Sequence, residues 1–421
     1  MQIGYPVARL MIVALLLILC GTGSDLTAQY TSLGTDFTFG FLQNRTLDNG
    51  RSSTGGNGDV RVAIYVSNHS GRGPATVEIS YSGADGAIEF EVDGLPVPSD
   101  GTTISVEVAP LSGRLVEFVP SAGHTPADLQ IMGNGRRDRR SYRVRSDEPI
   151  ALYAQSWQSA SRDVSLILPK PSLGSDYVVA APHPTPYARS RYGGPTEFAI
   201  VAVDDNTSVR FSLPRTVTVR LPGQPAESYP AGDHVIRLDA GETWQLQSDS
   251  LDLTGIRVHA DDCRPFALYA GNMAVDVPTT SGGTWDHVYE QMFPRRSWGR
   301  RYVTTPVTDG VWDLFKIISA IDNTTVRIDG LELRTAEGPL RLAAGEVLEI
   351  SDRVATSKGQ VVTNAPTRID RASYITSSAP VAVAQIGLSS AMHERSRRLD
   401  PFMIQNINQQ LSLGLWCYVD Q

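Results

Sequence analysis

An internal repeat is the feature that most constrains the fold of this chain. The stretch from Ile200 to Phe211 contains an apolar run, the polar sequence Asp-Asp-Asn-Thr and a second run rich in β-branched residues, and the same design returns from Ile317 to Ile328. Asp and Asn stabilise tight turns by bonding their own backbone, whereas Val, Ile and Phe favour strands. Each stretch is therefore predicted to be a β-hairpin.

The surroundings of the two stretches also correspond, which distinguishes a repeat from two similar turns. A proline leads an apolar strand at each of three positions, Pro149, Pro265 and Pro380, at intervals of 116 and 115 residues. The other matching segments are Pro169–Tyr177 with Pro294–Tyr302, Leu238–Glu242 with Leu342–Glu346, and a weaker first copy that starts at Leu33–Phe37. The chain is thus expected to contain three units of one design.

The composition favours strands over helices. Gly (37) and Pro (26) are frequent and charged residues make up only 19%, which is typical of a turn-rich all-β protein. We predict tandem β-sandwich-like units, because two packed sheets bury the apolar face of short alternating strands. The only helical candidate is the link Asp286–Phe293.

Domain boundaries follow from the repeat. The predicted parts are a signal peptide (1–28), β unit 1 (29–160), β unit 2 (161–280), β unit 3 (281–399), and residues 400–421 as the start of a fourth unit or a closing strand.

The N-terminus carries the features of a secretory signal. Arg9 precedes an apolar run from Leu10 to Cys20 that is too short to span a bilayer, and cleavage is expected after Ala28. Lipid attachment at Cys20 is the alternative. The mature chain would be secreted or held at the cell surface, with Cys263 as one of its two cysteines. Whether Cys263 pairs with Cys417 or both remain thiols stays open, because sequence does not bring them together.

Charge excludes some partners and suggests one surface. A net charge of −8 and a pI near 5.4 argue against a protein built to bind nucleic acid or an anionic membrane. One arginine-rich loop is the candidate ligand-binding site, for an acidic glycan or surface polymer, with a solvated loop as the alternative. Its members are Arg136, Arg137, Arg139 and Arg140. Lysine occurs only at Lys170, Lys316 and Lys358, a skew that genome base composition explains.

Metal and catalytic patterns are weak. Asp286, His287 and Glu290 would share one face if their segment were helical. The turns at Asp204–Asn206 and Asp322–Asn323 offer oxygen ligands to calcium, but metal-free turns explain them equally and neither supplies a full ligand set. No Gly-x-Ser-x-Gly sequence occurs. No cofactor and no catalytic residue is therefore predicted.

The motifs and their order resemble the IgGFc-binding protein N-terminal domain family. The likeness rests on Leu33–Phe37, the Leu-Gly-Ser-Asp-Tyr at Leu173, the Asp-Asn-Thr turns, Asp252–Gly255 and the proline-led strands. It implies an extracellular, non-enzymatic module of the kind found in a mucin-associated animal protein and in large bacterial surface or secreted proteins. A bacterial-type member is expected, and immunoglobulin binding is not transferred to it.

Three functions are compatible with these observations. The leading hypothesis is an exported, non-catalytic repeat protein that mediates adhesion or matrix contact by binding an extracellular protein or glycan. A secreted hydrolase or lyase acting on polysaccharide is the second, since paired carboxylates can come from distant loops. A structural spacer of a larger surface protein is the third. A cleft with two acids and aromatic walls would favour the enzyme.

Overall fold

A computed structural model describes residues 31–44, 60–84, 86–158, 161–185, 193–221, 224–277, 285–305, 313–351, 354–366, 368–387 and 413–415. The described residues from Ser32 onward belong to one compact unit. The predicted signal peptide (1–28), its cleavage site after Ala28, Cys20 and Cys417 lie outside the described residues. We keep the predicted boundaries as names and refer to repeats one, two and three.

The strands follow one another along the chain with few other elements. Repeat one contains β1 (Leu33–Phe39), β2 (Arg61–Asn68), β3 (Ala75–Tyr81), β4 (Ile88–Val92), β5 (Leu95–Val97), β6 (Thr103–Val108), β7 (Ser112–Pro120), the 3-10 turn η2 (Pro126–Leu129), β8 (Arg137–Asp138) and β9 (Tyr142–Gln158). Repeat two contains β10 (Ser161–Ile167), η3 (Lys170–Ser172), β11 (Asp176–Val178), β12 (Thr196–Ala202), β13 (Thr207–Leu213), β14 (Val217–Val219), β15 (Glu227–Tyr229), β16 (Gly232–Leu238), β17 (Thr243–Ser248), β18 (Arg257–Ala260) and β19 (Phe266–Val275).

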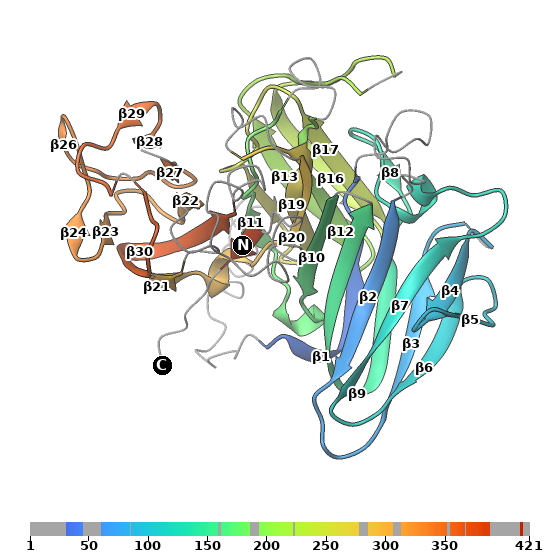
Figure 1. Ribbon diagram of the computed structural model, residues 1–421. Coiled ribbons are helices and arrows are strands. Elements are labelled where there is room, and N and C mark those ends of the chain that lie inside the picture. Colours follow the sequence, from blue (N-terminus) through green and yellow to red (C-terminus); the bar gives the residue numbers. More distant parts are fainter. Residues whose placement is uncertain are drawn as a thin grey trace, which may run out of the picture. The chain divides into compact units, whose positions relative to one another are not determined.

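Repeat three combines many short strands with one long strand. It contains β20 (Asp286–Gln291), η4 (Arg295–Ser297), β21 (Gly299–Thr304), β22 (Leu314–Ser319), β23 (Val326–Ile328), β24 (Leu331–Glu332), β25 (Arg334–Thr335), β26 (Gly338–Pro339), β27 (Val347–Ser351), β28 (Val354–Ser357), β29 (Gln360–Val361) and β30 (Ser373–Ile386), and β31 (Leu413–Leu415) follows. The described residues contain strands and three 3-10 turns but no α-helix, so the predicted all-β class is confirmed (Figure 1). None of the helices in the described part of the chain has the length and apolar character needed to cross a membrane.

The two runs of each stretch predicted as a hairpin do not pair with each other. β12 pairs with β17 and β19, whereas β13 pairs with β16 and β18 in a different sheet. In repeat three, β22 and β23 both pair with β30 but not with each other. The hairpin prediction was therefore wrong. A polar turn between two β-rich runs signals a reversal of direction, but it does not reveal whether the two runs pair.

The proline-led strands change pairing partners near the proline. In β30, residues 375–377 pair with β23 and residues 381–386 pair with β22, and Pro380 lies at the break between them. Proline has no N–H to give to a ladder, so it suits the residue at which a long strand leaves one layer for the other. β9 bends in the same way at Pro149, and in repeat two the strand is divided into β18 and β19 before Pro265.

Hydrogen bonds show that the repeat is also a structural one. In repeat two, Asp205 Oδ1 accepts the Ala240 N–H at 3.0 Å, and the Gly241 N–H donates to Ala202 O at 2.9 Å. In repeat three, Asp322 Oδ1 accepts the Ala344 N–H at 2.8 Å, and the Gly345 N–H donates to Ser319 O at 2.9 Å. The Asx turn and the Ala-Gly-Glu turn are thus one interlocked element in both copies.

Neighbouring repeats share their sheets. Phe198 and Ile200 of β12 face the core of repeat two, while Ala199 and Val201 on its other face pack into the core of repeat one. β22 is used in the same way, with Ile317 facing repeat three and Ile318 facing repeat two. Both faces of these strands are buried, which accounts for their mainly apolar sequence.

The helical candidate is the strand β20. It pairs antiparallel with β19, and its polar side chains meet the backbone of β10. Asp286 Oδ1 accepts the Arg162 N–H at 2.8 Å, and Gln291 Oε1 accepts the Leu168 N–H at 2.7 Å. The spacing of polar residues that imitated a helix arises because these buried groups bridge two strands that do not form a ladder together.

The strand β31 and Cys263 concern two predictions that the sequence left open, the role of residues 400–421 and the disulfide bond. β31 pairs with the end of β30, as β10 pairs with β9 and β20 with β19. Cys263 is disulfide-bonded, and both other cysteines of the chain, Cys20 and Cys417, lie outside the described residues.

Candidate ligand-binding groove and the joint beside it

A groove with a volume of about 1020 Å³ lies between repeats two and three. One wall is the sheet formed by β13, β16 and β18, and the other is the Ala-Gly-Glu turn of repeat three. Apolar and aromatic groups line it, among them Phe211, Ile256 and Val347, together with His234 and Asp233. The Phe211 and His234 rings lie 5.1 Å apart between centroids. A concave site with aromatic groups and a few polar ones is the usual form of a binding site.

The two walls approach closely at a pair of glycines. A β-carbon on Gly255 would lie 2.6 Å from Gly345 O, and Gly255 has a φ of +92°. Glycine is required at such a position because a side chain would meet the backbone of the opposite wall. The Asp-Leu-Thr-Gly motif at Asp252 therefore serves the contact between repeats.

Most charged residues of the groove are paired, with Asp233 as an exception among the described residues. Arg257 makes two hydrogen bonds to Asp176, at 2.8 and 3.0 Å, and Arg210 is paired with Asp261. Glu346 is held by Lys358 at 2.7 Å. Burial alone would raise the pKa of Glu346, but the Ala343 N–H and Lys358 hold this pKa below its usual range.

Next to the groove, repeats two and three meet at a second contact, which we call the joint. Lys316 of repeat three is buried there against residues of repeat two. The side chain of Lys316 is 0% exposed. Its Nζ donates to Ala181 O at 2.7 Å, to Asp252 Oδ2 at 2.6 Å and to Thr254 Oγ1 at 3.1 Å. Burial alone would raise the pKa of Asp252, but Lys316 and His183 hold that pKa below its usual range.

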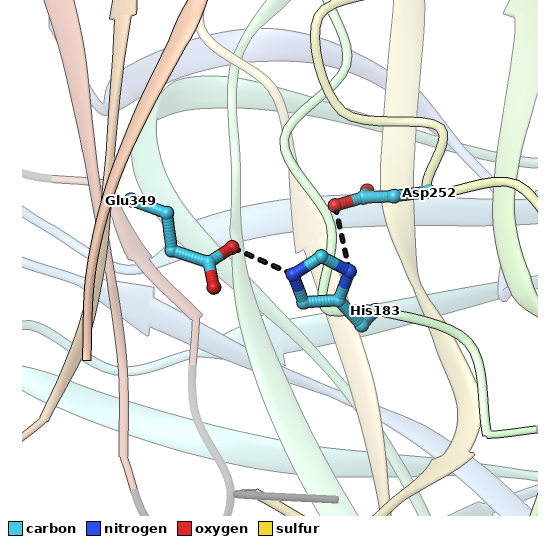
Figure 2. A group of neighbouring side chains, drawn as sticks. All are labelled: His183, Asp252 and Glu349. Carbon is cyan, nitrogen blue, oxygen red and sulfur yellow. Dashed lines mark hydrogen bonds and ion pairs between the residues drawn. The ribbon is translucent and has the colours of Figure 1, made fainter. Parts of the chain in front are cut away.

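His183 links the acids of the two repeats. Its Nδ1 lies 3.2 Å from Asp252 Oδ2, and its Nε2 lies 2.7 Å from Glu349 Oε2 (Figure 2). Glu349 also lies 3.8 Å from Lys316 Nζ. Burial alone would raise the pKa of Glu349, but His183 and Lys316 hold this pKa below its usual range.

This cluster does not converge on a metal ion. The ligand atoms of His183, Asp252 and Glu349 lie within 4.8 Å of one another. The two carboxylates, however, meet opposite edges of the imidazole ring (Figure 2). One ion bound to either ring nitrogen would leave the other acid on the far side, and the Lys316 ammonium already supplies the positive charge.

The joint between repeats one and two is neutral at the same positions. Ala199 pairs with Gln245 across β12 and β17, as Lys316 pairs with Glu349 across β22 and β27. Gln245 Nε2 donates to Gly133 O of repeat one at 3.2 Å. The fold of the repeat is therefore satisfied without a lysine and an acid at these places.

The predicted arginine site is a loop of repeat one that docks on repeat two. β8, which includes Arg137, adds to the edge of β17. Arg136 is paired with Glu227, and Arg140 with Asp138 and Asp128. Arg136, Arg137 and Arg139 are exposed, whereas Arg140 is half-buried. The four arginines thus lie along one loop but not in the groove.

The residues that the sequence offered as metal ligands have structural roles instead. His287 and Glu290 lie an odd number of residues apart on β20, so they point to opposite faces and do not share a metal-binding face. Asp204 is paired with Lys170 at 2.6 Å, while Asp205 and Asp322 accept backbone N–H groups of the interlocked turns.

Sequence reasoning missed the joint. His183, Asp252 and Glu349 are scattered along the chain and have no ligand spacing. One signal was present, because Lys316 interrupts the apolar run of repeat three at the position where repeat two has Ala199. Comparison of aligned repeats would have singled it out.

Fold and groove together define an all-β repeat protein whose ligand-sized site is built between two repeats. Residues 163–411 match the family described as IgGFc binding protein, which is more than half of the chain, and the chain belongs to this family. A stretch of 213 residues is 32% identical to the IgGFc-binding protein of Homo sapiens and covers 50% of this chain but only 4% of that relative. No solved structure matches the chain.

Proposed function

We propose that this chain is an exported, non-catalytic repeat protein that mediates adhesion or matrix contact by binding an extracellular protein or glycan. The groove between repeats two and three is the observation that carries this proposal. Its apolar lining, the rings of Phe211 and His234, and its paired cations and carboxylates suit a polar ligand with flat apolar faces, such as a sugar chain or a protein loop. The membership in the IgGFc-binding family supports protein binding, and immunoglobulin Fc is one ligand to test.

The arginine loop is a second surface that we propose for ligand binding. Arg136, Arg137 and Arg139 are exposed and could contact acidic groups of a ligand. Their ion pairs with Glu227 and Glu242 reduce the charge that they offer. We therefore rank this loop behind the groove.

The hydrolase alternative has one observation in its favour, because acids and aromatic rings do line the groove. A glycosidase needs a carboxyl group whose pKa is raised so that it can protonate the leaving group. Asp252 and Glu346 have the opposite property, since Lys316 and Lys358 contribute to holding their pKa values below the usual range. The binding function is therefore the better supported.

The test is a screen of the purified full chain against an array of glycans and extracellular proteins that includes immunoglobulin Fc, with product analysis of the same polysaccharides in solution. We expect saturable binding without cleavage. Release of shorter sugars would replace this proposal by the hydrolase. Neither binding nor cleavage would favour a spacer.

A further inference from the structure

We propose that Lys316 and Asp252 become joined by an isopeptide bond that covalently links repeats two and three. The two side chains come from β22 and from the turn before β18, and the lysine nitrogen lies 2.6 Å from one oxygen of the carboxyl group. This inference goes beyond ligand binding and does not depend on it.

The nucleophile would be Lys316 Nζ, which is buried and in contact with the carboxyl group of Asp252. Lys316 Nζ is excluded from solvent and is held by Ala181 O and Thr254 Oγ1, which leave the carboxyl group of Asp252 as its third neighbour. Fixing two reacting groups in contact removes most of the entropic cost of bringing them together. Against the effect of burial, Lys316 and His183 hold the pKa of Asp252 below its usual range, so the resting pair is ionic, and the neutral amine and acid that react form when one proton crosses the 2.6 Å contact.

The electrophile is polarised by a backbone donor. Asp252 Oδ1 accepts the Thr254 N–H at 2.9 Å, on the oxygen that does not face the lysine. This donor would stabilise the negative charge that develops on Oδ1 when nitrogen attacks Cγ. Oδ1 then remains as the carbonyl oxygen of the new amide, and Oδ2 is the oxygen that leaves.

A proton relay reaches the leaving oxygen. His183 Nδ1 lies 3.2 Å from Asp252 Oδ2, so His183 can deliver a proton to it. Glu349 contacts the other ring nitrogen at 2.7 Å and orients the ring, which makes it a positioning residue. Its distance of 3.8 Å from Nζ also allows it to receive a proton from the nitrogen.

The reaction balances without a further reactant. One proton passes from the ammonium to the carboxylate, and the amine then attacks Cγ. The C–N bond forms, the bond from Cγ to Oδ2 breaks, and Oδ2 leaves as water with two of the three protons that were on Nζ. The third proton stays on the amide nitrogen, and nothing is oxidised or reduced.

The repeat supplies an internal control. Ala199 and Gln245 occupy the positions of Lys316 and Glu349 at the first joint, and both are buried there. The fold alone therefore does not require the charged set. A covalent link at the second joint would keep the walls of the groove together.

Trypsin digestion of the purified full chain, reduced beforehand and followed by mass spectrometry, tests the bond. Trypsin does not cut at an amide-bonded lysine. We therefore expect one branched product in most molecules, in which residues 238–257 are joined to residues 302–327 with the mass of one water missing. Separate recovery of 302–316 and 317–327 from the folded chain would overturn the proposal, as would a branch to the peptide containing Glu349.

Substitutions at the four residues of the joint test the role of each in bond formation. Lys316→Arg keeps the cation and is expected to fold without a branched product. Asp252→Asn is expected to give a product of the same mass, because ammonia then leaves in place of water. His183→Gln and Glu349→Gln should lower the linked fraction of the freshly purified chain at least tenfold while circular dichroism stays unchanged. An unchanged linked fraction in both would refute the relay.

Discussion

Gly174 of repeat two lies against Pro294, the residue that precedes the η4 turn of repeat three. A β-carbon on Gly174 would stand 2.5 Å from Cβ of Pro294. The same relation joins Gly34 to Pro169, where the distance would be 2.3 Å. The Leu-Gly of each opening motif is thus the place where the following repeat makes contact.

Gly174→Ala is expected to destabilise the chain by about 1 to 3 kcal/mol, because the added methyl group must displace a proline ring. Gly71→Ala is the matched control, since a β-carbon there would meet nothing within 4 Å. Denaturant unfolding measures both. Equal stability of the two variants would show that the close contact carries no energetic weight.

The interlocked turns predict parallel effects in the two repeats. Asp205→Ala and Asp322→Ala each remove one acceptor of a backbone N–H and should each cost about 1 kcal/mol. Asp205→Asn and Asp322→Asn retain an acceptor and should cost less. Thermal unfolding gives the comparison, and a large loss in one repeat with none in the other would contradict the structural equivalence.

His287 predicts a loss of stability in mild acid. Burial lowers the pKa of His287 from 6.5 to about 4. The unfolded chain binds a proton below pH 6.5 that the folded chain does not bind until about pH 4. Stability should therefore fall over this interval, by about 3 kcal/mol in total. Unfolding midpoints between pH 4 and 7 should flatten in His287→Gln and not in the exposed control His69→Gln; the same slope in both variants would argue against the assignment.

Glu197 predicts the opposite dependence on pH. Burial raises the pKa of Glu197 well above its usual value of 4.5. The folded chain keeps the proton that the unfolded chain releases, so stability is lost as pH rises above 4.5. Glu197→Gln keeps the acceptor for Gln247 and should be more stable than the parent by at least about 1 kcal/mol at pH 7.

The gain in Glu197→Gln should shrink as pH falls toward 4.5, which chemical unfolding at several pH values would show. Glu78→Gln is the exposed control and should change little. A gain that is independent of pH would mean that the carboxyl group is ionised in the folded chain.

The all-β class and the copied turns could be predicted from the sequence because both depend on local patterns. Strand pairing could not. The runs flanking Asp205 pair with residues far along the chain, and no local signal tells a corner from a hairpin. β20 looked helical because its buried polar residues satisfy the backbone of β10, which lies more than one hundred residues away in sequence.

The joint was hidden for the same reason. Lys316 contacts Asp252 only after two repeats have packed, so the residue types alone did not suggest a site. The arginine loop was visible in sequence because its charges are consecutive, but consecutive charge does not show that Arg136 and Arg140 find acidic partners.

Binding at the groove is the central claim, and a saturation isotherm with three variants of the full chain tests it most directly. The ligand selected on the array would be titrated against the parent chain, against Asp233→Asn combined with His234→Gln, and against the variant in which Arg136, Arg137, Arg139 and Arg140 are all alanine. Arg72→Ala is the control for a surface arginine. We predict that the groove variant weakens binding at least tenfold and that the arginine variant does so less. Full binding by the groove variant, with loss in the arginine variant, would contradict this account and move the site to the loop.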